Sequence, residues 1–405
     1  MTKLARDPRA LALLLASTLT VLSNATISPA LPGLLALFKG TPHAELLTRM
    51  LVTAPSLLVA ITAPLAGAAA DRFGRRRQLL AGIVLFSIAG SAGLVLPGLV
   101  AILVSRLFLG AAVASMMTAH SALVGDYFTG PQRAQFMSIQ LATTNFGGFL
   151  FISAAGVLAG ISPRLPFAIY GVGLLLLPLL WRVIVEVPRK DAGDGDLNAP
   201  AQDASNGRPG HWQLQVAVAA ALVGMVFVTF YALPTQLPFY LQAQGYADPS
   251  AAGQAMAALT LAGSIAALLQ ARFGPSSHPE RIPPLGAALM ALGFGLLSQT
   301  HSLWTVTAAV GLAGLGLGTL LPPLVTIVLN VAPAQKRGTA MGTLTTCIFM
   351  GQFLSPLVAQ PLITSFSYAT AFQVMTALLM GKAVVLWLWL RPSRPDLNSS
   401  SSAAT

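Results

Sequence analysis

The stretch Gly67-Ala68-Ala69-Ala70-Asp71-Arg72-Phe73-Gly74-Arg75-Arg76-Arg77 joins two long apolar runs and carries one acid and four arginines. These charges cannot lie in hydrocarbon, because each would cost about 2.5–3.5 kcal/mol at the centre of a bilayer. Short loops rich in lysine and arginine stay on the cytoplasmic side of a membrane. We therefore expect this stretch to form a cytoplasmic loop between two membrane helices and to set the orientation of the protein.

The composition predicts a protein that crosses the membrane many times. The chain has 405 residues, of which 55% are hydrophobic and 9% are charged, whereas soluble domains carry about 25% charged residues. The formal net charge of +11 is spread over short loops, so we expect no nucleic-acid partner. The sequence has a single cysteine, Cys347, no cluster of metal ligands and no phosphate-binding loop for ATP. No enzymatic activity, metal or cofactor is expected.

The apolar runs predict twelve membrane helices, because a spanning helix needs about 20 mainly apolar residues. In the first half of the chain the expected helices lie at 10–38, 46–70, 77–97, 100–125, 134–160 and 165–186. In the second half they lie at 213–233, 249–271, 284–300, 303–330, 339–365 and 368–390. The predicted fold is an all-α membrane protein with two pseudo-symmetric six-helix bundles.

A polar stretch divides the chain near its middle and could not form an apolar core. The expected organisation is an N-terminal half at 1–186, a cytoplasmic linker at 187–212, a C-terminal half at 213–391 and a disordered cytoplasmic tail at 392–405.

The two halves look like repeats of each other. At one constant offset Arg133 aligns with Arg337 and Gly147 with Gly351. Two repeated halves with a site between them at the midplane are typical of secondary transporters. With both termini in the cytoplasm most basic loops face inward, as the distribution of Lys and Arg requires.

The loop also carries a family resemblance. Gly67-x-x-x-Asp71-Arg72-x-Gly74-x-Arg76-Arg77 resembles the loop between the second and third helices of the major facilitator superfamily. The resemblance implies transport by alternating access, with the first, fourth, seventh and tenth helices lining the cavity. It also implies a latch that holds the cytoplasmic side closed, and the expected gating residues are Gly67, Asp71, Arg72, Gly74, Arg76, Arg77, Asp126 and Arg133. Asp71 is expected to meet the start of the helix near Gly338, while the alternative is that these charges merely orient the loop.

Two basic groups inside the fourth predicted helix are candidates for ion coupling. Arg106 is costly in a membrane and is therefore a candidate functional residue, and Arg106-x-x-x-Gly110 resembles the fourth-helix motif of the superfamily. The alternative is that Arg106 snorkels to the outer surface. His120 is the other candidate, because its pKa lies naturally near neutrality, although a structural role is the alternative. Lys382, in the last helix, is expected to snorkel.

Polar and aromatic side chains on the expected cavity helices are candidates for substrate binding: Asn24, Gln140, Asn145, Phe146, Phe227, Phe230, Tyr231 and Gln236. An apolar pocket with a few polar anchors suits amphiphilic ligands, and helix packing is the alternative for each aromatic ring. The chain departs from the drug antiporter pattern in two places. Asn24 stands where an embedded acid is common, and the fifth helix lacks a proline before Gly147 and Gly148.

The resemblance implies a multi-pass transporter of the bacterial inner membrane that binds a small-molecule substrate, contacts membrane lipid and works as a monomer. The leading hypothesis is proton-coupled efflux of small amphiphilic compounds or drugs, powered by the proton gradient. The alternative is export of an anionic or polar metabolite, such as a sugar, organic acid or siderophore, because Arg106 is not opposed by a buried acid. A sensor or assembly role is a third hypothesis, but the repeated halves are a transporter design.

Overall fold

The computed structural model describes residues 7–186, 212–273, 281–300, 302–333 and 336–390. The expected tail at 392–405 and the expected linker, except residue 212, lie outside these ranges. For Asn24 and Asp71 the structure describes the backbone and not the side chain. Within the described residues, eleven helices are long and apolar enough to cross a membrane, and a shorter apolar helix, Ile282–Leu297, stands where the ninth was expected.

The helices of the first half follow the order that the sequence predicts. They are α1 (Pro8–Ala25), η2 (Ser28–Ala30), α2 (Leu31–Leu37), α3 (Ala44–Phe73), α4 (Arg75–Ser91), η3 (Ala92–Leu94), α5 (Leu99–Tyr127), α6 (Gly130–Ile161), η4 (Leu165–Gly171) and α7 (Val172–Val183). The first predicted helix is interrupted, because Pro29 and Pro32 lack the backbone donors that a continuous helix needs.

The second half repeats this pattern. Its helices are α8 (Trp212–Phe230), α9 (Ala232–Ala243), α10 (Pro249–Phe273), α11 (Ile282–Leu297), α12 (Leu303–Val331), α13 (Arg337–Ser365) and α14 (Tyr368–Trp389). The seventh predicted helix ended at 233, before Pro234, but α9 continues to Ala243. Pro234 lies in the first turn of α9, where its missing N–H has no intrahelical partner to lose.

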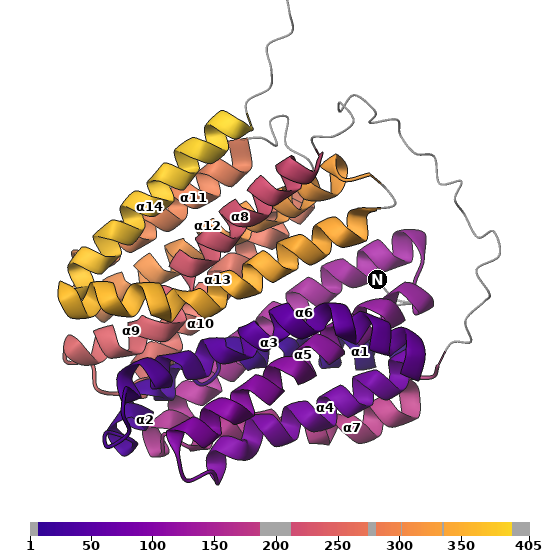
Figure 1. Ribbon diagram of the computed structural model, residues 1–405, viewed down its shortest axis with the longest axis horizontal. Helices are drawn as coiled ribbons and strands as arrows, with labels where there is room; N and C mark the ends of the chain where they lie inside the picture. Colours follow the sequence, from indigo (N-terminus) through magenta and orange to yellow (C-terminus); the bar gives the residue numbers. More distant parts are fainter. Residues whose placement is uncertain (1–6, 187–211, 274–280, 301, 334–335, 391–405) are drawn as a thin grey trace, which may run out of the picture.

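Each half has its own apolar core, and the halves lie against each other as two groups of helices (Figure 1). The first core is built from α1 to α7 and includes Phe239 and Phe349 of the second half. The second core is built from α8 to α14 and includes Ile152 of the first half. Ile152 lies on α6, which packs on α10, and Phe349 lies on α13, which packs on α3. Phe239 lies on α9, which also contacts α3.

Glycine allows close packing at equivalent places in the two halves. A Cβ at Gly110 would lie 2.1 Å from the carbonyl oxygen of Pro55, and a Cβ at Gly314 would lie 2.1 Å from that of Leu259. Small residues let helix backbones approach closely where lipid removes the hydrophobic driving force. The aligned glycines therefore perform the same packing role in α5 and α12.

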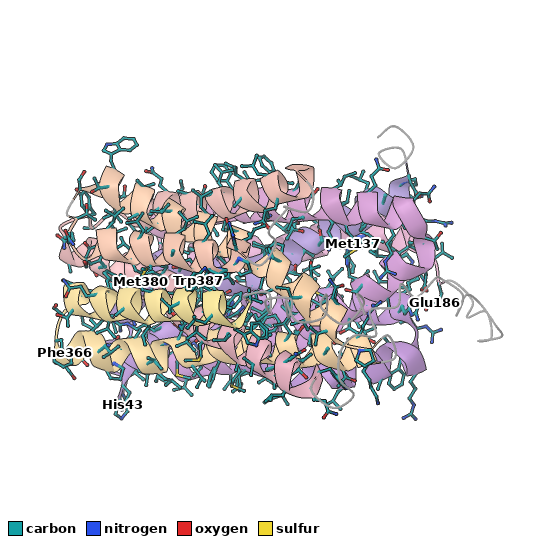
Figure 2. The ribbon with its side chains drawn as sticks, turned by 90° about the horizontal axis from the view of Figure 1, so that it is seen from above. His43, Met137, Glu186, Phe366, Met380 and Trp387 are labelled. Carbon is teal, nitrogen blue, oxygen red and sulfur yellow. The ribbon has the colours of Figure 1, made fainter. Side chains whose placement is uncertain are left out.

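The bundle has two chemically different ends. Glu186 lies at one end, which also carries Arg72 to Arg77 and is called the basic end below (Figure 2). His43 and Phe366 lie at the other, called the opposite end.

Candidate functional site

A buried polar network joins the two halves near the opposite end. Arg49 of α3 is 4% exposed and donates from Nε to the Gln236 side-chain oxygen at 2.8 Å. Gln236, on α9, is fully buried and donates to the Gln360 amide oxygen of α13 at 3.3 Å. Gln360 in turn donates to the Glu45 carboxylate at 3.0 Å. The network is therefore a closed ring, since Arg49 also lies 3.9 Å from that carboxylate.

The ring is reinforced by contacts around it. The Arg49 guanidinium lies 4.0 Å from the centre of the Phe239 ring, and a desolvated cation–π contact contributes about 2 kcal/mol. Closer to the middle of the bundle, Ser56 donates to Gln352 across the halves at 2.7 Å. Ser28 of η2 donates to the Pro234 carbonyl oxygen at 2.5 Å. These cross-half bonds lie between the middle of the bundle and the opposite end, and they hold that end closed.

The break in the first predicted membrane helix explains part of this contact. Ser28 lies in the short η2 helix, where the Pro-containing chain turns toward α9. Glu45 and Arg49 lie four residues apart at the start of α3, a spacing that places opposite charges on the same helix face.

Gln236 is one of the candidates for substrate binding, whereas the sequence patterns did not single out Arg49. The structure places both residues in the polar ring. Two features of the sequence could have indicated the ring. Glu45 and Arg49 are four residues apart, and Gln352 and Gln360 lie inside an apolar helix, where polar side chains often join membrane helices.

At the basic end, the charged loop is organised within the first half. Arg75 forms an ion pair with Asp126 at the end of α5. Arg133, another expected gating residue, is exposed, and its guanidinium lies 4.0 Å from where a Cβ at Gly125 would stand. Arg76 donates to the Trp181 carbonyl oxygen at 2.7 Å and lies 4.8 Å from the ring of that tryptophan. Arg72 and Arg77 are exposed.

Glu186 caps the start of α4, a role that the sequence analysis missed. Its carboxylate accepts hydrogen bonds from the backbone N–H of Arg75 at 2.8 Å and of Arg76 at 2.9 Å. Gly74, between α3 and α4, has a φ of 92°, which favours glycine, and a Cβ there would lie 3.2 Å from the carboxylate. The motif glycine thus makes both the turn and the close approach of Glu186 possible.

We expect Glu186→Gln to destabilise this loop, because the carboxylate meets the positive end of the α4 dipole. The loss should be about 0.5–2 kcal/mol of stability, measured as a lower midpoint of thermal unfolding of the purified transporter. Glu45→Gln, at the other end, is a matched charge change that should leave hydrogen exchange at the start of α4 unchanged. Faster exchange there in Glu45→Gln than in Glu186→Gln would contradict the capping role.

The start of α13, in the second half, is exposed at the basic end. Among the residues that the structure describes, a Cβ added at Gly338 or Gly342 of α13 would meet nothing within 4 Å, and Thr339 and Thr343 are exposed. In the middle of the same helix, a Cβ at Gly351 would lie 2.2 Å from the Gly224 carbonyl oxygen. That contact lies within the second half, whereas the cross-half hydrogen bonds of Arg49 and Ser56 lie toward the opposite end and the start of α13 is exposed at the basic end.

Arg106 lies inside the first half and does not snorkel. It is fully buried in α5, between the rings of Phe167 and Tyr170, with centroid distances of 4.8 and 4.7 Å. One terminal nitrogen donates to the carbonyl oxygens of Ala89, at 3.4 Å, and Gly90. Its Nε and Nη1 atoms have no hydrogen-bond partner among the described residues. A cation held by carbonyls and aromatic rings is a costly arrangement of the kind found at functional sites.

The two other embedded bases also point inward. His120 is 5% exposed, and its Nε2 lies 3.0 Å from the Leu13 carbonyl oxygen of α1. Lys382 is 6% exposed and donates to the Met225 carbonyl oxygen at 2.6 Å and to Thr229 Oγ1 at 2.7 Å. The expectation that Lys382 snorkels is wrong, because α8 offers it two oxygen acceptors inside the second half.

Three aromatic candidates form one cluster. Phe227, Phe230 and Tyr231 lie at the end of α8, with ring centroids 5.9–6.2 Å apart, and each is at most 8% exposed. Such burial fits helix packing at the break between α8 and α9. Gln140 and Asn145 are partly exposed on α6, and Asn24 lies in the last turn of α1.

Phe146 lies away from the contact between the halves. It is 64% exposed and shares a helix face with Leu150 and Val157, which are 52% and 61% exposed. The neighbouring Gly147 and Gly148 instead pack on Thr18 and Val21 of α1. The helical period therefore places Phe146 on the outer surface of α6.

The two repeated groups of helices, with polar contacts between them, are typical of a membrane transporter. The family model of the Major Facilitator Superfamily matches residues 13–294 and 278–405. The chain belongs to this superfamily, and it is a secondary active transporter.

Similar proteins include two whose names refer to drug resistance. The chain is 23% identical to "Quinolone resistance protein NorA" of Staphylococcus aureus (strain MRSA252), over 83% of this chain and 86% of that one. It is 32% identical to "Multidrug resistance protein 2" of Bacillus subtilis (strain 168), over 29% of each chain.

Solved structures share the fold. A D-xylose–proton symporter superposes with a TM-score of 0.76 at 17% identity, covering 94% of this chain and 97% of that one. The human organic anion transporter MFSD10 superposes with a TM-score of 0.70 at 18% identity, covering 96% and 100%.

Proposed function

We propose that this protein exports small amphiphilic compounds across a bacterial inner membrane in exchange for protons. The observation that carries this proposal is the similarity to NorA, named as a quinolone resistance protein, over more than four-fifths of the chain. A shorter match, at 32% identity, to a multidrug resistance protein supports it. Beside the polar ring, Ile152 and Phe349 give the contact between the halves an apolar part, which suits amphiphilic ligands better than strongly hydrated ones.

In the proposed orientation the basic end lies in the cytoplasm, together with both termini. The loop of Arg72 to Arg77 supports this, because short arginine-rich loops stay inside. The state described here then faces the cytoplasm, where it would take up a compound for export. Release would require the Arg49–Gln236 contact to open and the basic end to close, and the protein would work as a monomer because one chain holds both halves.

The closed basic end would use the residues of the charged loop. Asp126, Arg75 and Glu186 hold the loop within the first half, so that it moves as one unit with α3 and α4. The open space at Gly338 and Gly342 leaves room for α13 to approach. Asp71, Arg72, Arg76 and Arg77 are then proposed to form the latch with the start of α13, whose positive end attracts an acid.

Arg106 is proposed as part of the proton coupling. The Arg106 side chain cannot move out of the first half without losing its contacts with the Gly90 carbonyl oxygen and two aromatic rings. A water molecule that accepted hydrogen bonds from its unpaired N–H groups would therefore change the balance between the two states. His120 is the second candidate, between α5 and α1.

The test uses everted membrane vesicles that are energised to be acid inside and loaded with a pH-sensitive dye. We expect cationic amphiphiles to release protons through the wild type and at least about tenfold more slowly through Arg106→Ala, because a buried charged hydrogen bond contributes about 1.5–3 kcal/mol. Arg164→Ala, which alters a partly buried arginine bound to Leu94 and Leu96 carbonyls, is the control. Matched amounts of membrane protein exclude a folding defect.

Organic anions and sugars complete the panel. A response to these compounds but not to cations would support the metabolite exporter and would make Arg106 a substrate anchor. Proton release in Arg106→Ala at the wild-type rate would contradict its role in coupling. A wild type that moves no proton with any compound would contradict proton exchange as the mechanism.

A further inference from the structure

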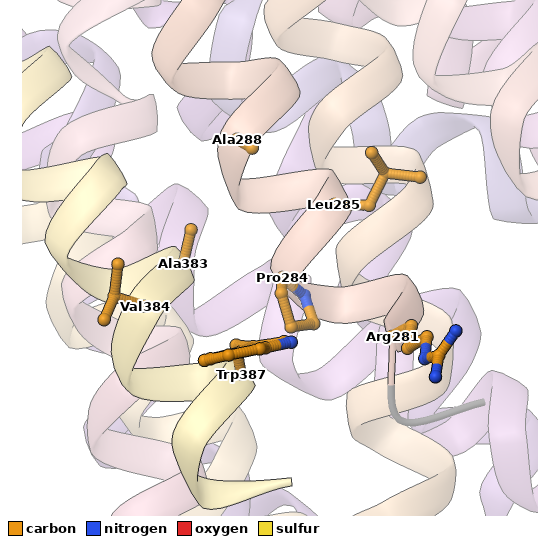
Figure 3. A pocket seen from close by; sticks show the side chains of 7 residues that line it. All are labelled: Arg281, Pro284, Leu285, Ala288, Ala383, Val384 and Trp387. Carbon is orange, nitrogen blue, oxygen red and sulfur yellow. The ribbon is translucent and has the colours of Figure 1, made fainter. Parts of the chain in front are cut away.

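A groove on the outer surface of the second half lies between α11 and α14. It has a volume of about 390 Å³, and Arg281, Leu285, Ala288, Val384 and Trp387 are among its lining residues. Figure 3 shows α11 contributing Arg281, Leu285 and Ala288 on one side, and α14 contributing Val384 and Trp387 on the other. Apart from Arg281 and the indole N–H, the groove is apolar.

The groove is on the surface that meets the lipid. Leu285, Val384 and Trp387 are 56%, 52% and 45% exposed, although all three lie in apolar helices of the membrane bundle. Water does not reach such a surface, so hydrocarbon must cover it. The groove runs from Arg281 to Ala288, which is about 10 Å along the helix at 1.5 Å per residue.

The short α11 helix places Arg281 close to the acyl chains. Its 16 residues span about 24 Å, compared with a hydrocarbon core of about 30 Å, whereas the 22 residues of α14 span about 33 Å. A helix shorter than the bilayer draws its flanking charged residue toward the membrane, and a long side chain then reaches back to the headgroups. Trp387 faces the same end of the groove, where indole rings favour the interface.

Arg281 is the charged donor at the mouth of the groove. Pro283 and Pro284 occupy the first turn of α11 and offer no backbone N–H to an anion. The Arg281 side chain is exposed, and its planar guanidinium suits a phosphate. The charge at the mouth is thus complementary to an anionic headgroup, and the apolar floor is complementary to an acyl chain.

We propose that this groove binds one anionic phospholipid of the cytoplasmic leaflet, with its phosphate at Arg281 and one acyl chain between α11 and α14. The leaflet follows from the proposed orientation, whereas the site itself does not depend on the substrate or on proton coupling. The lipid covers the short α11 helix and fills the space beside Ala288.

The test measures lipid binding to the full-length purified transporter by native mass spectrometry, with equal amounts of phosphatidylglycerol and phosphatidylcholine. Arg281→Gln should lower the preference for phosphatidylglycerol about fivefold, because one basic residue near a membrane surface contributes about that factor. Ala288→Phe should fill the groove and lower the binding of both lipids without changing their ratio. Arg182→Gln, an exposed arginine of α7 in the first half, should have no effect.

The preference is the decisive quantity, and it is independent of transport. An unchanged preference in Arg281→Gln, or an equal loss in Arg182→Gln, would overturn the proposal, since the charge effect would then be general. Loss of the preference on removal of residues 391–405, with Arg281 intact, would also overturn it by assigning the anion site to the tail.

Discussion

Arg49→Ala is expected to open the opposite end of the transporter and to lower transport at least about tenfold. Arg49 is 4% exposed and holds the fully buried Gln236 across the halves. Its removal leaves that amide oxygen without its partner, and an unsatisfied buried polar group costs about 1–3 kcal/mol. The state open at the opposite end exposes the amide to water and escapes this cost, so the population shifts toward it by about tenfold per 1.4 kcal/mol.

Thiol labelling measures this shift directly. The native Cys347 is first replaced by alanine. Thr53→Cys then places a single thiol one helical turn after Arg49 on α3, at a position that is fully buried. A thiol reagent that does not cross the membrane should label this cysteine faster when Arg49 is also replaced by alanine. Arg164→Ala provides the control, because its hydrogen bonds to Leu94 and Leu96 stay within the first half. Equal labelling with and without Arg49, together with normal transport, would contradict the gating role of the ring.

Arg49→Lys separates charge from geometry. Nε of Arg49 reaches Gln236 while Nη1 reaches the Glu45 carbonyl oxygen at 2.8 Å. A lysine keeps the charge but lacks this fork, because its three donors share one nitrogen. We expect intermediate labelling, closer to that of the alanine variant.

Gly253→Val is expected to prevent closure of the opposite end and to abolish transport. A Cβ at Gly253 of α10 would lie 2.9 Å from Cα of Gly156 in α6, which belongs to the other half. The Cβ is fixed to the backbone of α10 and the Cα belongs to the backbone of α6, so neither can turn away. The two halves must separate at this point, and the state described here becomes inaccessible.

A series of substitutions shows whether size is the cause. Gly253→Ala should have a smaller effect than Gly253→Val, and Gly156→Val should repeat the effect from the other side of the contact. Gly311→Val is the control, since a Cβ at Gly311 of α12 would make ordinary contacts, the nearest at 3.9 Å. The readouts are transport rate and labelling of Thr53→Cys, which should rise in the two blocking variants. Normal transport in Gly253→Val would show that the helices do not need to meet here.

In the state described here the polar ring at the opposite end is formed, whereas the proposed latch at the basic end is not. Among the described residues, the basic end has open space around Gly338 and Gly342. A ligand shifts such an equilibrium only by its differential affinity for the two states. Substitutions in the ring and in the latch should therefore move thiol accessibility at the two ends in opposite directions.

Most helix positions followed from apolar length alone, because a bilayer accepts a continuous backbone only as a helix with its own hydrogen bonds satisfied. The predictions differed from the structure mainly near prolines. Pro29 and Pro32 interrupt the first helix, and Pro234 begins a new helix instead of ending one. A proline in the sequence shows where a backbone N–H is missing. Whether the helix ends, bends or restarts there depends on how the neighbouring segments pack.

The candidate site was predicted unevenly. The motif of the loop at 67–77 identified the family, and Arg106 stood out as a charged residue within an apolar run. Both signals are local in the sequence. They did not reveal that Asp126 pairs with Arg75, that Glu186 caps α4 from a distant part of the chain, or that Phe146 lies on the outer face of α6. These properties depend on how helices rotate and meet.

The sequence by itself determined a helical membrane protein of the major facilitator superfamily with repeated halves, because hydrophobic length and loop charge act locally. Only the tertiary structure decided which polar residues join the halves. Glu45, Arg49, Gln236 and Gln360 come from three helices of both halves, and their hydrogen bonds form only when those helices pack. Such bonds are strong in a dry interior and leave little trace in local sequence, since their energy arises from partners that are distant along the chain.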